Sequence, residues 1–296
     1  MIRPTIRQLE YLRALDNEKS FSRAAANCNV TQSTLSAGIK DLENILGHQL
    51  VNRAGRSKIT LTAFGSDVAA QTTIILNDVD HIVAKAKQMR APLSGILRMG
   101  VIPTIAPDFL PHVLNPLQEA YPDLELQLYE DMSERLIEQL NKRQLDVALL
   151  AFPYETEGME CHDLFKEDFY LATPKDKNIP DNLSIKDIMP EELLLLEEGH
   201  CLRDHALSAC NLHPSPKRKT FSATSLATLI QMVGHGYGVT LLPEMAIKYS
   251  SMPKEINIAP FSIPAPTRQI GLVWPSNSPL KRDLLALLET LRGIGA

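Results

Sequence analysis

Cys201 and Cys210 are the side chains in this sequence best suited to redox chemistry. Cys201 follows a short apolar stretch and the turn residue Gly199, so we expect it near the N-terminus of a helix running through residues 204–209. The helix dipole and the charge of Arg203 would both favour the thiolate at that position. Because the thiolate is the form of cysteine that attacks a peroxide, the segment predicts a peroxide-reactive residue.

The spacing of the two cysteines sets a geometric condition on any bond between them. In a continuous helix, their nine-residue separation at about 1.5 Å per residue puts the Cα atoms roughly 13 Å apart. A disulfide needs Cα atoms about 4.4–6.8 Å apart. A bond within the pair would therefore require this segment to unwind, and a redox event there would be a conformational switch.

Other interpretations of the cysteines compete with this one. Local sequence alone favours an inert core cysteine at the first position of the pair. A zinc site built from the pair with His200 and His205 lacks the close spacing of structural zinc sites. The adjacent Cys161 and His162 are a weak metal signal, and Cys28 has the context of a small buried residue. We therefore expect neither a bound metal nor a cofactor.

Composition and charge bound the class of protein. The chain has 296 residues, 44% hydrophobic and 22% charged, which is typical of a globular protein with two or three domains. Residues 1–91 carry twelve Lys and Arg against eight Asp and Glu, whereas the remainder carries eighteen against twenty-seven. Only the N-terminal part is suited to face a polyanion. Without a secretory signal or an apolar run of about 20 residues, we expect a cytoplasmic protein that does not contact a membrane.

The first 65 residues have the pattern of three short helices and a hairpin. Apolar residues recur at helical spacing over 6–15, small residues crowd 22–26, and Ser20 and Thr31 are suited to cap the second and third helices, with Gly47 at the end of the third. Two short helices joined by a tight turn match the geometry that enters the DNA major groove. The outward polar residues of the third helix are Gln32, Ser33, Thr34, Ser36 and Lys40.

A basic hairpin completes this predicted winged helix-turn-helix. Residues 50–53 and 59–61 have strand character, and Arg53, Arg56 and Lys58 would place three cations on the wing, within reach of phosphates. The alternative is a helical subdomain with a solvated basic loop.

A long helix is predicted over residues 62–89. Val68, Ile75, Ile82 and Met89 recur every seven residues, which predicts a coiled-coil seam of about four heptads that pairs two chains. Twofold pairing would present two recognition helices to an inverted repeat in DNA. The alternative is that this stripe packs on the next domain of its own chain.

The C-terminal 200 residues predict an α/β domain. Apolar strands at 96–102, 124–129 and 145–150 surround an amphipathic helix at 133–142, which predicts a βαβ unit and a parallel sheet. Such sheets usually bind ligands beyond the strand carboxyl ends, often between two lobes. Further apolar strands are predicted at 169–172, 193–196, 239–242 and 270–274.

The run RQLEYLRAL…SFSRAAANCNVTQSTLSAGIKDLENILGHQLVNR…ITLTAFG resembles the N-terminal domain of LysR-type transcriptional regulators. The resemblance implies a dimeric or tetrameric DNA-binding regulator whose base and backbone contacts fall on Gln32, Ser33, Thr34, Ser36, Arg53 and Arg56. It implies a winged helix-turn-helix over 1–65, a dimerisation linker helix over 66–91 and a two-lobed, periplasmic-binding-protein-like α/β regulatory domain over 92–296. Lobe I would comprise about 92–166 and 269–296, and lobe II about 167–268.

The sequence also resembles the peroxide-sensing OxyR subgroup of that family, through GHCLRD, VIPTIAP, FSATSLATLIQMV and TRQIGLVW. This resemblance implies that Cys201 is oxidised to sulfenic acid and that Cys210 resolves it as a disulfide. It implies that Thr104 and His200 orient the peroxide with a contribution from Ser133, that Arg268 stabilises charge near the sulfur, and that Asp204 acts after the first oxidation. Ser133 stands where the subgroup has threonine, which removes a methyl group and keeps the hydroxyl.

Three functions are weighed. The leading hypothesis is a hydrogen peroxide-sensing regulator, not an enzyme, that activates antioxidant genes as a dimer or homotetramer. Its partners would be promoter DNA with inverted-repeat half-sites, RNA polymerase, and thioredoxin or glutaredoxin as reductant. The second is a LysR-type regulator that binds a small organic effector between its lobes. The third is a thiol peroxidase fused to DNA-binding helices, which would consume peroxide repeatedly.

Overall fold

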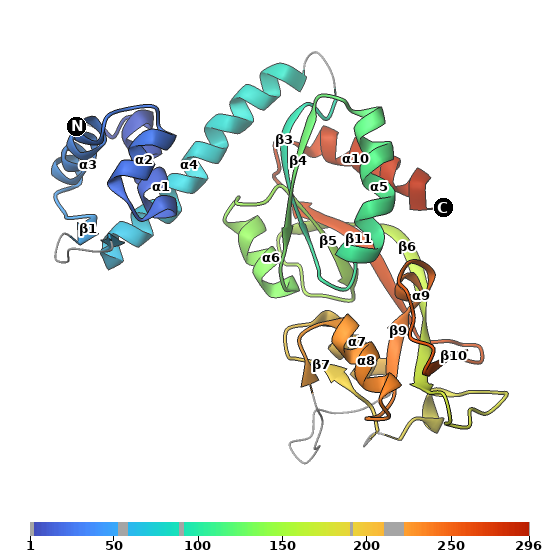
Figure 1. Ribbon diagram of the computed structural model, residues 1–296. Helices are drawn as coiled ribbons and strands as arrows, with labels where there is room; N and C mark the ends of the chain where they lie inside the picture. Colours follow the sequence, from blue (N-terminus) through green and yellow to red (C-terminus); the bar gives the residue numbers. More distant parts are fainter. Residues whose placement is uncertain (1–2, 53–58, 89–91, 190–191, 210–221, 296) are drawn as a thin grey trace. The chain divides into compact units, whose positions relative to one another are not determined.

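The computed structural model describes residues 3–52, 59–88, 92–189, 192–209 and 222–295 (Figure 1). The chain divides into two compact units, Met1–Ala86 and Lys87–Ala296. The first is mostly helical and the second is built on a large β-sheet. Each unit has a hydrophobic interior of its own.

Three helices and a short hairpin form the N-terminal part of the first unit, as predicted. They are α1 (Ile6–Glu18), α2 (Phe21–Asn27), α3 (Gln32–Leu46) and the antiparallel strands β1 (Val51–Asn52) and β2 (Thr60–Leu61). Thr31 caps α3 by accepting the Thr34 amide, and Gly47 ends it with a φ of 73°. Ser20 occupies the N-cap position of α2, but its side chain makes no capping hydrogen bond. Arg53, Arg56 and Lys58 lie outside the described residues.

The long helix α4 (Ala63–Gln88) follows the hairpin. Ala69, Thr72 and Leu76 are buried within the chain, whereas Ile75 and Ile82 are exposed, Ile82 to 70%. The two exposed isoleucines belong to the predicted heptad seam, and Met89, its last member, lies outside the described residues. This side of the helix is therefore open to a partner.

The second unit contains a seven-stranded mixed sheet in the order β10-β6-β11-β5-β3-β4, with β9 also paired to β6. The strands are β3 (Gly95–Val101), β4 (Leu124–Glu130), β5 (Val147–Phe152), β6 (Met159–Pro174), β9 (Thr240–Pro243), β10 (Ile256–Pro260) and β11 (Thr267–Pro275). The prediction of a parallel sheet is right for β3, β4 and β5 but wrong for the rest. The reason is that β11 runs opposite to both β5 and β6 and inserts between them.

Two strands differ in length from their predictions. The strand expected at 169–172 is the end of the 16-residue β6, which contributes to both halves of the sheet. The strand expected at 193–196 is reduced to β7 (Leu195–Leu196), which pairs in parallel with β8 (Ser222–Ala223). The adjacent Leu193 makes a separate bridge to Val239. A single turn of 3-10 helix, η1 (Ile185–Asp187), lies between β6 and β7.

Two hydrophobic cores divide this unit into lobes. The core of lobe I lies among β3, β5 and β11 and the helices α5 (Ala106–Ala120), α6 (Ser133–Asn141) and α10 (Lys281–Gly295). The core of lobe II lies among β6, β7, β9 and the helices α7 (Cys201–Ala209) and α8 (Leu226–Gly234), with α9 (Glu244–Tyr249) contacting both cores. No helix among the described residues is long and apolar enough to span a membrane.

Candidate functional site

Cys201 is the first residue of α7, a helix whose start packs against the hydrophobic cores of both lobes. Gly199, with a φ of 96°, turns the chain into this helix, as predicted. The Cys201 side chain is 4% exposed and belongs to the hydrophobic core of lobe I. The next apolar residues of the helix, Leu202, Ala206 and Leu207, belong to the core of lobe II. The start of α7 is therefore held by both lobes at once.

A small pocket surrounds the Cys201 side chain. Four of the predicted site residues line it together: Thr104, Ser133, His200 and Cys201. They come from the loop after β3, the first turn of α6 and the start of α7. In this conformation the pocket has no room for a sphere the size of a water molecule. A reactant can reach the sulfur only if the surrounding side chains move.

Arg268 on β11 is buried beside this pocket. Its Nε donates to Oε1 of Glu167 at 2.6 Å, its Nη1 to Oγ1 of Thr104 at 3.0 Å, and its Nη2 to the Thr104 carbonyl at 3.2 Å. The hydroxyl of Thr104 accepts from the guanidinium, so its own hydrogen is left to donate elsewhere. Arg268 thus joins β11 and β6 to a residue that lines the pocket.

The electrostatics of Cys201 differ from the prediction made for Arg203. Burial raises the pKa of the Cys201 thiol, and the positive charge of Arg268 and the nearby Ser133 hydroxyl act in the opposite direction. Arg203, the cation expected to favour the thiolate, instead donates to the Leu196 carbonyl and lies 3.8 Å from the Glu198 carboxylate. The sequence prediction assumed an accessible helix N-terminus, whereas the tertiary fold buries the sulfur.

Asp204 and Cys210 are two predicted site residues that the structure does not place in the pocket: one is exposed and the other lies outside the described residues. Asp204 is exposed on α7, and its negative charge acts to raise the pKa of Cys201. Cys210 lies outside the described residues, and α7 is described as far as Ala209. The structure therefore brings together Cys201, His200, Thr104, Ser133 and Arg268, with Asp204 on the outer side of the helix.

His205 is a buried residue of this region that the sequence analysis did not select as part of the redox site. It follows Cys201 by four residues on α7, a spacing that puts two side chains on one face of a helix. Its Nε2 lies 3.4 Å from the Pro153 carbonyl, so this nitrogen carries the proton. Within the described residues, neither Nδ1 of His205 nor Nε2 of His200 has a hydrogen-bond partner. The Cys-x-x-x-His spacing in the sequence is the feature that could have indicated that His205 lies on the same helix face as Cys201.

We expect the free energy of unfolding to fall as the pH drops below about 6.5. Burial lowers the pKa of both His200 and His205 in the folded protein. Between that lowered pKa and the ordinary value, the unfolded chain binds more protons than the folded one, so stability is lost as the pH falls. Denaturant unfolding at several pH values measures this slope. Replacing both histidines by glutamine should flatten it; an unchanged slope in the double variant contradicts the assignment.

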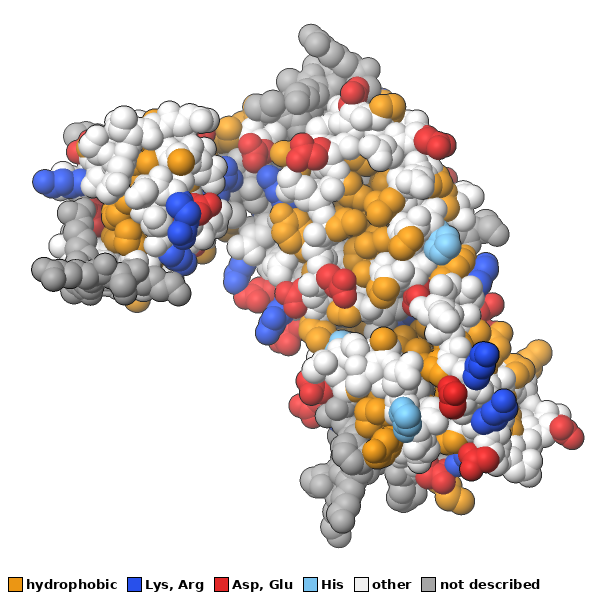
Figure 2. Space-filling view, viewed as in Figure 1, with side chains coloured by type: hydrophobic (Ala, Val, Ile, Leu, Met, Phe, Trp, Pro, Cys, Tyr) orange, Lys and Arg blue, Asp and Glu red, His pale blue; other side chains and the backbone are white. Residues whose placement is uncertain are grey.

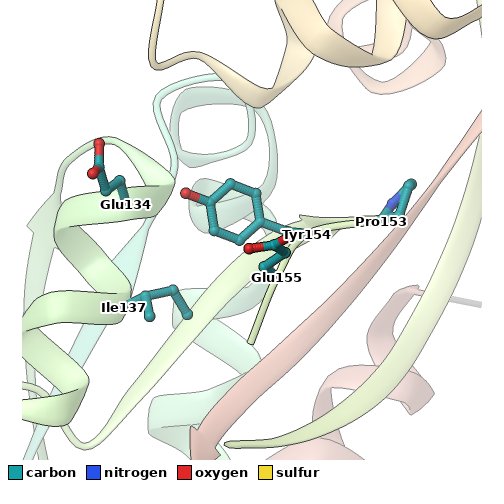
Figure 3. Close-up of a pocket in the computed structure, with 5 residues that line it drawn as sticks. All are labelled: Glu134, Ile137, Pro153, Tyr154 and Glu155. Atoms are coloured by element: carbon teal, nitrogen blue, oxygen red, sulfur yellow. The ribbon is translucent and has the colours of Figure 1, made fainter. Parts of the chain in front are cut away.

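A larger, open pocket lies at the end of β5. Its volume is about 690 Å³, and it is lined by Glu134, Ile137, Pro153, Tyr154 and Glu155. Figure 3 shows the Tyr154 ring between the side chains of Glu134 on α6 and Pro153. Burial raises the pKa of Tyr154, and the charges of Glu134, Cys201, Asp204 and Glu155 add to this effect. The pocket is therefore acidic, because Glu134 and Glu155 both line it.

The other cysteines are not part of a metal site in the described chain. No group of three His, Cys, Asp or Glu residues there has the geometry to hold a metal ion. Cys161 is exposed, with its sulfur 2.9 Å from the Thr156 hydroxyl. Cys28 is half-buried and packs at the margin of the first unit's core.

The candidate nucleic-acid surface lies at the start of α3. Gln32, Ser33 and Thr34 are exposed in its first turn, and Ser36 is half-buried in the second. The opposite face of the helix holds the fully buried Leu35, Ile39 and Leu42. This amphipathic division leaves the predicted base-reading side chains free to meet a groove.

A helix-turn-helix unit, a long helix and a two-lobed α/β unit together define a LysR-type transcriptional regulator. The first unit matches the model for bacterial regulatory helix-turn-helix proteins of the lysR family over residues 6–66, and the second matches the LysR substrate binding domain over residues 90–295. The chain belongs to the LysR family.

Within that family the chain is homologous to OxyR. It is 38% identical over 289 residues to the DNA-binding transcriptional dual regulator OxyR of Escherichia coli, covering 97% of this chain and 94% of OxyR. It is 39% identical over 295 residues to the transcriptional regulator EstR of Acinetobacter baylyi, covering 99% of this chain and 98% of EstR. The full-length structure of an OxyR variant from Pseudomonas aeruginosa aligns with a TM-score of 0.77 at 32% identity, covering 99% of this chain and 96% of that one. These relatives are regulators of transcription rather than enzymes.

Proposed function

We propose that this OxyR-like regulator senses hydrogen peroxide by oxidation of Cys201 and disulfide formation with Cys210. The observation that carries the proposal is the convergence of Thr104, Ser133 and His200 on one pocket around a buried Cys201, with Arg268 behind it. Two relatives support the chemistry: the protein of Haemophilus influenzae, 38% identical, is named a hydrogen peroxide-inducible genes activator, and an OxyR mutant of Corynebacterium glutamicum has been solved with H2O2 bound.

The first step is attack of the Cys201 thiolate on one peroxide oxygen. An S–O bond forms, the O–O bond breaks, and hydroxide leaves to be protonated to water, so Cys201 becomes a sulfenic acid. Thr104, whose oxygen accepts from Arg268, would donate its hydrogen to the peroxide, with His200 and Ser133 completing the pocket. Arg268 opposes the cost of placing a negative sulfur in this buried position.

The second step couples chemistry to shape. The Cys210 thiolate attacks the Cys201 sulfur, an S–S bond forms, and hydroxide leaves and is protonated to water. Asp204, on the exposed side of α7, would act at this stage. Because the disulfide needs α7 to unwind, and α7 is held by both lobes, its formation would change the contacts between them.

The proposed switch controls the DNA-binding end of the chain. Residues 1–65 would bind promoter DNA at inverted-repeat half-sites, residues 66–91 would pair two chains, and residues 92–296 would be the sensor. In that sensor, lobe I would comprise about 92–166 and 269–296, and lobe II about 167–268. The assembly would be a dimer or a homotetramer that activates antioxidant genes with RNA polymerase, and thioredoxin or glutaredoxin would reduce it.

Figure 2 shows hydrophobic side chains gathered over α5 and the neighbouring strands. The edge strand β4 also exposes Leu128 and Tyr129. This hydrophobic surface is suited to contact a second copy of the chain.

The redox proposal is tested by mapping free thiols in the full chain before and after about one equivalent of hydrogen peroxide. The wild type should form a Cys201–Cys210 disulfide, and the Cys210→Ser variant should hold a trappable sulfenic acid at Cys201. Thiols that remain unchanged would refute the proposal. Sustained consumption of many equivalents of peroxide per chain would instead identify a thiol peroxidase.

Substitutions in the first unit should separate base reading from phosphate contact. Gln32→Ala is expected to alter the preference between DNA sites, by about 1–3 kcal/mol at one base pair. Arg53→Ala is expected to weaken binding to all sequences alike and to reduce the salt slope by roughly one. Titrations of specific and unrelated DNA at several salt concentrations measure both. If both variants changed only overall affinity, the assignment of α3 to the groove would be wrong.

A second candidate function is control by a small organic effector. The open pocket of about 690 Å³ at Glu134, Tyr154 and Glu155 has the size of a ligand site. EstR, which is as similar to this chain as OxyR is, is not named for a peroxide response. A Cys201→Ser variant that keeps an inducible response would favour this function.

A further inference from the structure

We propose that Glu167 is a positioning residue for the redox site, which holds the Arg268 guanidinium against Thr104, a residue of the pocket around Cys201. The inference deepens the proposed function and rests on it for its biological meaning. Glu167 has no motif of its own in the sequence and is not one of the residues that line the pocket. Its effect would pass entirely through Arg268.

The two carboxylate oxygens of Glu167 have different fixed partners. Oε1 accepts from Nε of Arg268 at 2.6 Å, and Oε2 accepts from the backbone amide of Met245, in the first turn of α9, at 3.0 Å. Glu167 is 4% exposed and Arg268 is 1% exposed, so water does not compete for these bonds. The carboxylate is therefore anchored to α9 as well as to the arginine.

The backbone places the two charged residues directly opposite each other. Glu167 on β6 and Arg268 on β11 are register partners in the antiparallel ladder. The other end of the arginine is tied to the loop after β3 by two bonds to Thr104. With Nε, Nη1 and Nη2 all bonded, the planar guanidinium has a single orientation.

This orientation matters because the positive charge of Arg268 acts against the rise in the pKa of Cys201 that burial causes. The attraction between a cation and a thiolate weakens with distance. It is stronger in a buried site of low dielectric than in water, so a change in distance has a larger effect there. Without the bond to Glu167, the guanidinium of Arg268 would no longer be held in its orientation toward Thr104 and the pocket around the sulfur. Both the ionisation of Cys201 and the donor hydrogen of Thr104 would then be affected together.

A different role for Glu167 is simple charge compensation for a buried arginine. The two roles separate in two substitutions. Glu167→Asp keeps the charge and shortens the reach, so it disturbs position only. Glu167→Gln keeps the reach and one acceptor oxygen but removes the charge. Positioning predicts that the aspartate variant is the more impaired at Cys201, whereas charge compensation predicts that it behaves as wild type.

The experiment measures Cys201 ionisation and oxidation in the full chain. The thiolate absorbance of each protein is followed against pH, with the same protein carrying Cys201→Ser subtracted, and the rate of sulfenic acid formation is followed in the Cys210→Ser background. We expect Glu167→Asp to move the thiolate titration up by about one pH unit and to slow oxidation near neutral pH by roughly tenfold. Glu167→Gln should stay within about threefold of wild type.

Asp108→Asn is the matched control. Asp108 is also a buried carboxylate, and its Oδ1 accepts from Ser250, at the end of α9, at 2.5 Å. The hydrogen bonds of Arg268 go to Glu167 and Thr104 and not to Asp108. Asp108→Asn should therefore lower the stability of the fold without moving the titration of Cys201. Thermal unfolding of every variant confirms that folded protein is compared.

The outcomes distinguish this inference from the proposed function. A thiolate titration in Glu167→Asp equal to that of the wild type, or an equal shift in Asp108→Asn, would overturn the positioning role. If wild-type Cys201 were not oxidised by peroxide at all, the peroxide proposal would fail. The titration would still report in that case whether Glu167 positions Arg268.

Discussion

Replacing Cys201 by serine is expected to abolish the transcriptional response to hydrogen peroxide and to leave DNA binding in the reduced state unchanged. Serine has nearly the size of cysteine, so it should fill the same buried position between the lobes. Its hydroxyl cannot form a sulfenic acid or a disulfide, so neither step of the switch can occur. Footprinting on a target promoter, with and without peroxide, measures the two states directly.

Cys161→Ser provides the control for this experiment. Cys161 is exposed and lies beside Thr156, and it has no place in the proposed chemistry. The Cys161 variant should respond to peroxide as the wild type does. A peroxide response that survives Cys201→Ser would contradict the redox mechanism, and a response to an organic compound in the same variant would direct attention to the pocket at Tyr154.

Arg268→Met is expected to lower the free energy of unfolding by about 3–5 kcal/mol, the usual effect of breaking a buried ion pair. The substitution leaves the Glu167 carboxylate buried without its partner at 2.6 Å, and removes both bonds to Thr104. It also removes the charge that offsets burial of Cys201, so oxidation by peroxide should slow in parallel. Denaturant unfolding and the rate of sulfenic acid formation measure the two effects.

The double variant Arg268→Met with Glu167→Met separates these effects. Removing both charges eliminates the unpaired carboxylate, so much of the lost stability should return. The reactivity of Cys201 should not return, because no cation remains beside the pocket. A double variant as unstable as Arg268→Met alone would show that the arginine stabilises the fold by packing rather than by pairing.

Local pattern predicted much of this molecule. Apolar periodicity and the caps at Thr31 and Gly47 were sufficient to predict α3, because a helix is fixed by residues three and four positions apart. Gly199 predicted the turn before Cys201 for a similarly local reason. The resemblance of the GHCLRD segment and of three distant segments to one subgroup selected the residues of the pocket, although local sequence alone favoured an inert cysteine.

Strand direction and electrostatics were decided by the tertiary structure. The mixed sheet arises because β11 inserts between β5 and β6, a pairing between strands far apart in the chain that no local pattern encodes. The same pairing sets Glu167 opposite Arg268.

The sequence by itself determined which residue types suit redox chemistry, and that two cysteines nine residues apart in one continuous helix can bond only if that helix unwinds. Only the tertiary structure decided that the sulfur is buried, that Arg203 is bonded to the Leu196 carbonyl instead of favouring the thiolate, and that α7 is packed into both lobes. The reason is physical: residue types and helical spacing are properties of neighbouring positions, whereas burial and the potential at an atom depend on every group that the fold brings around it.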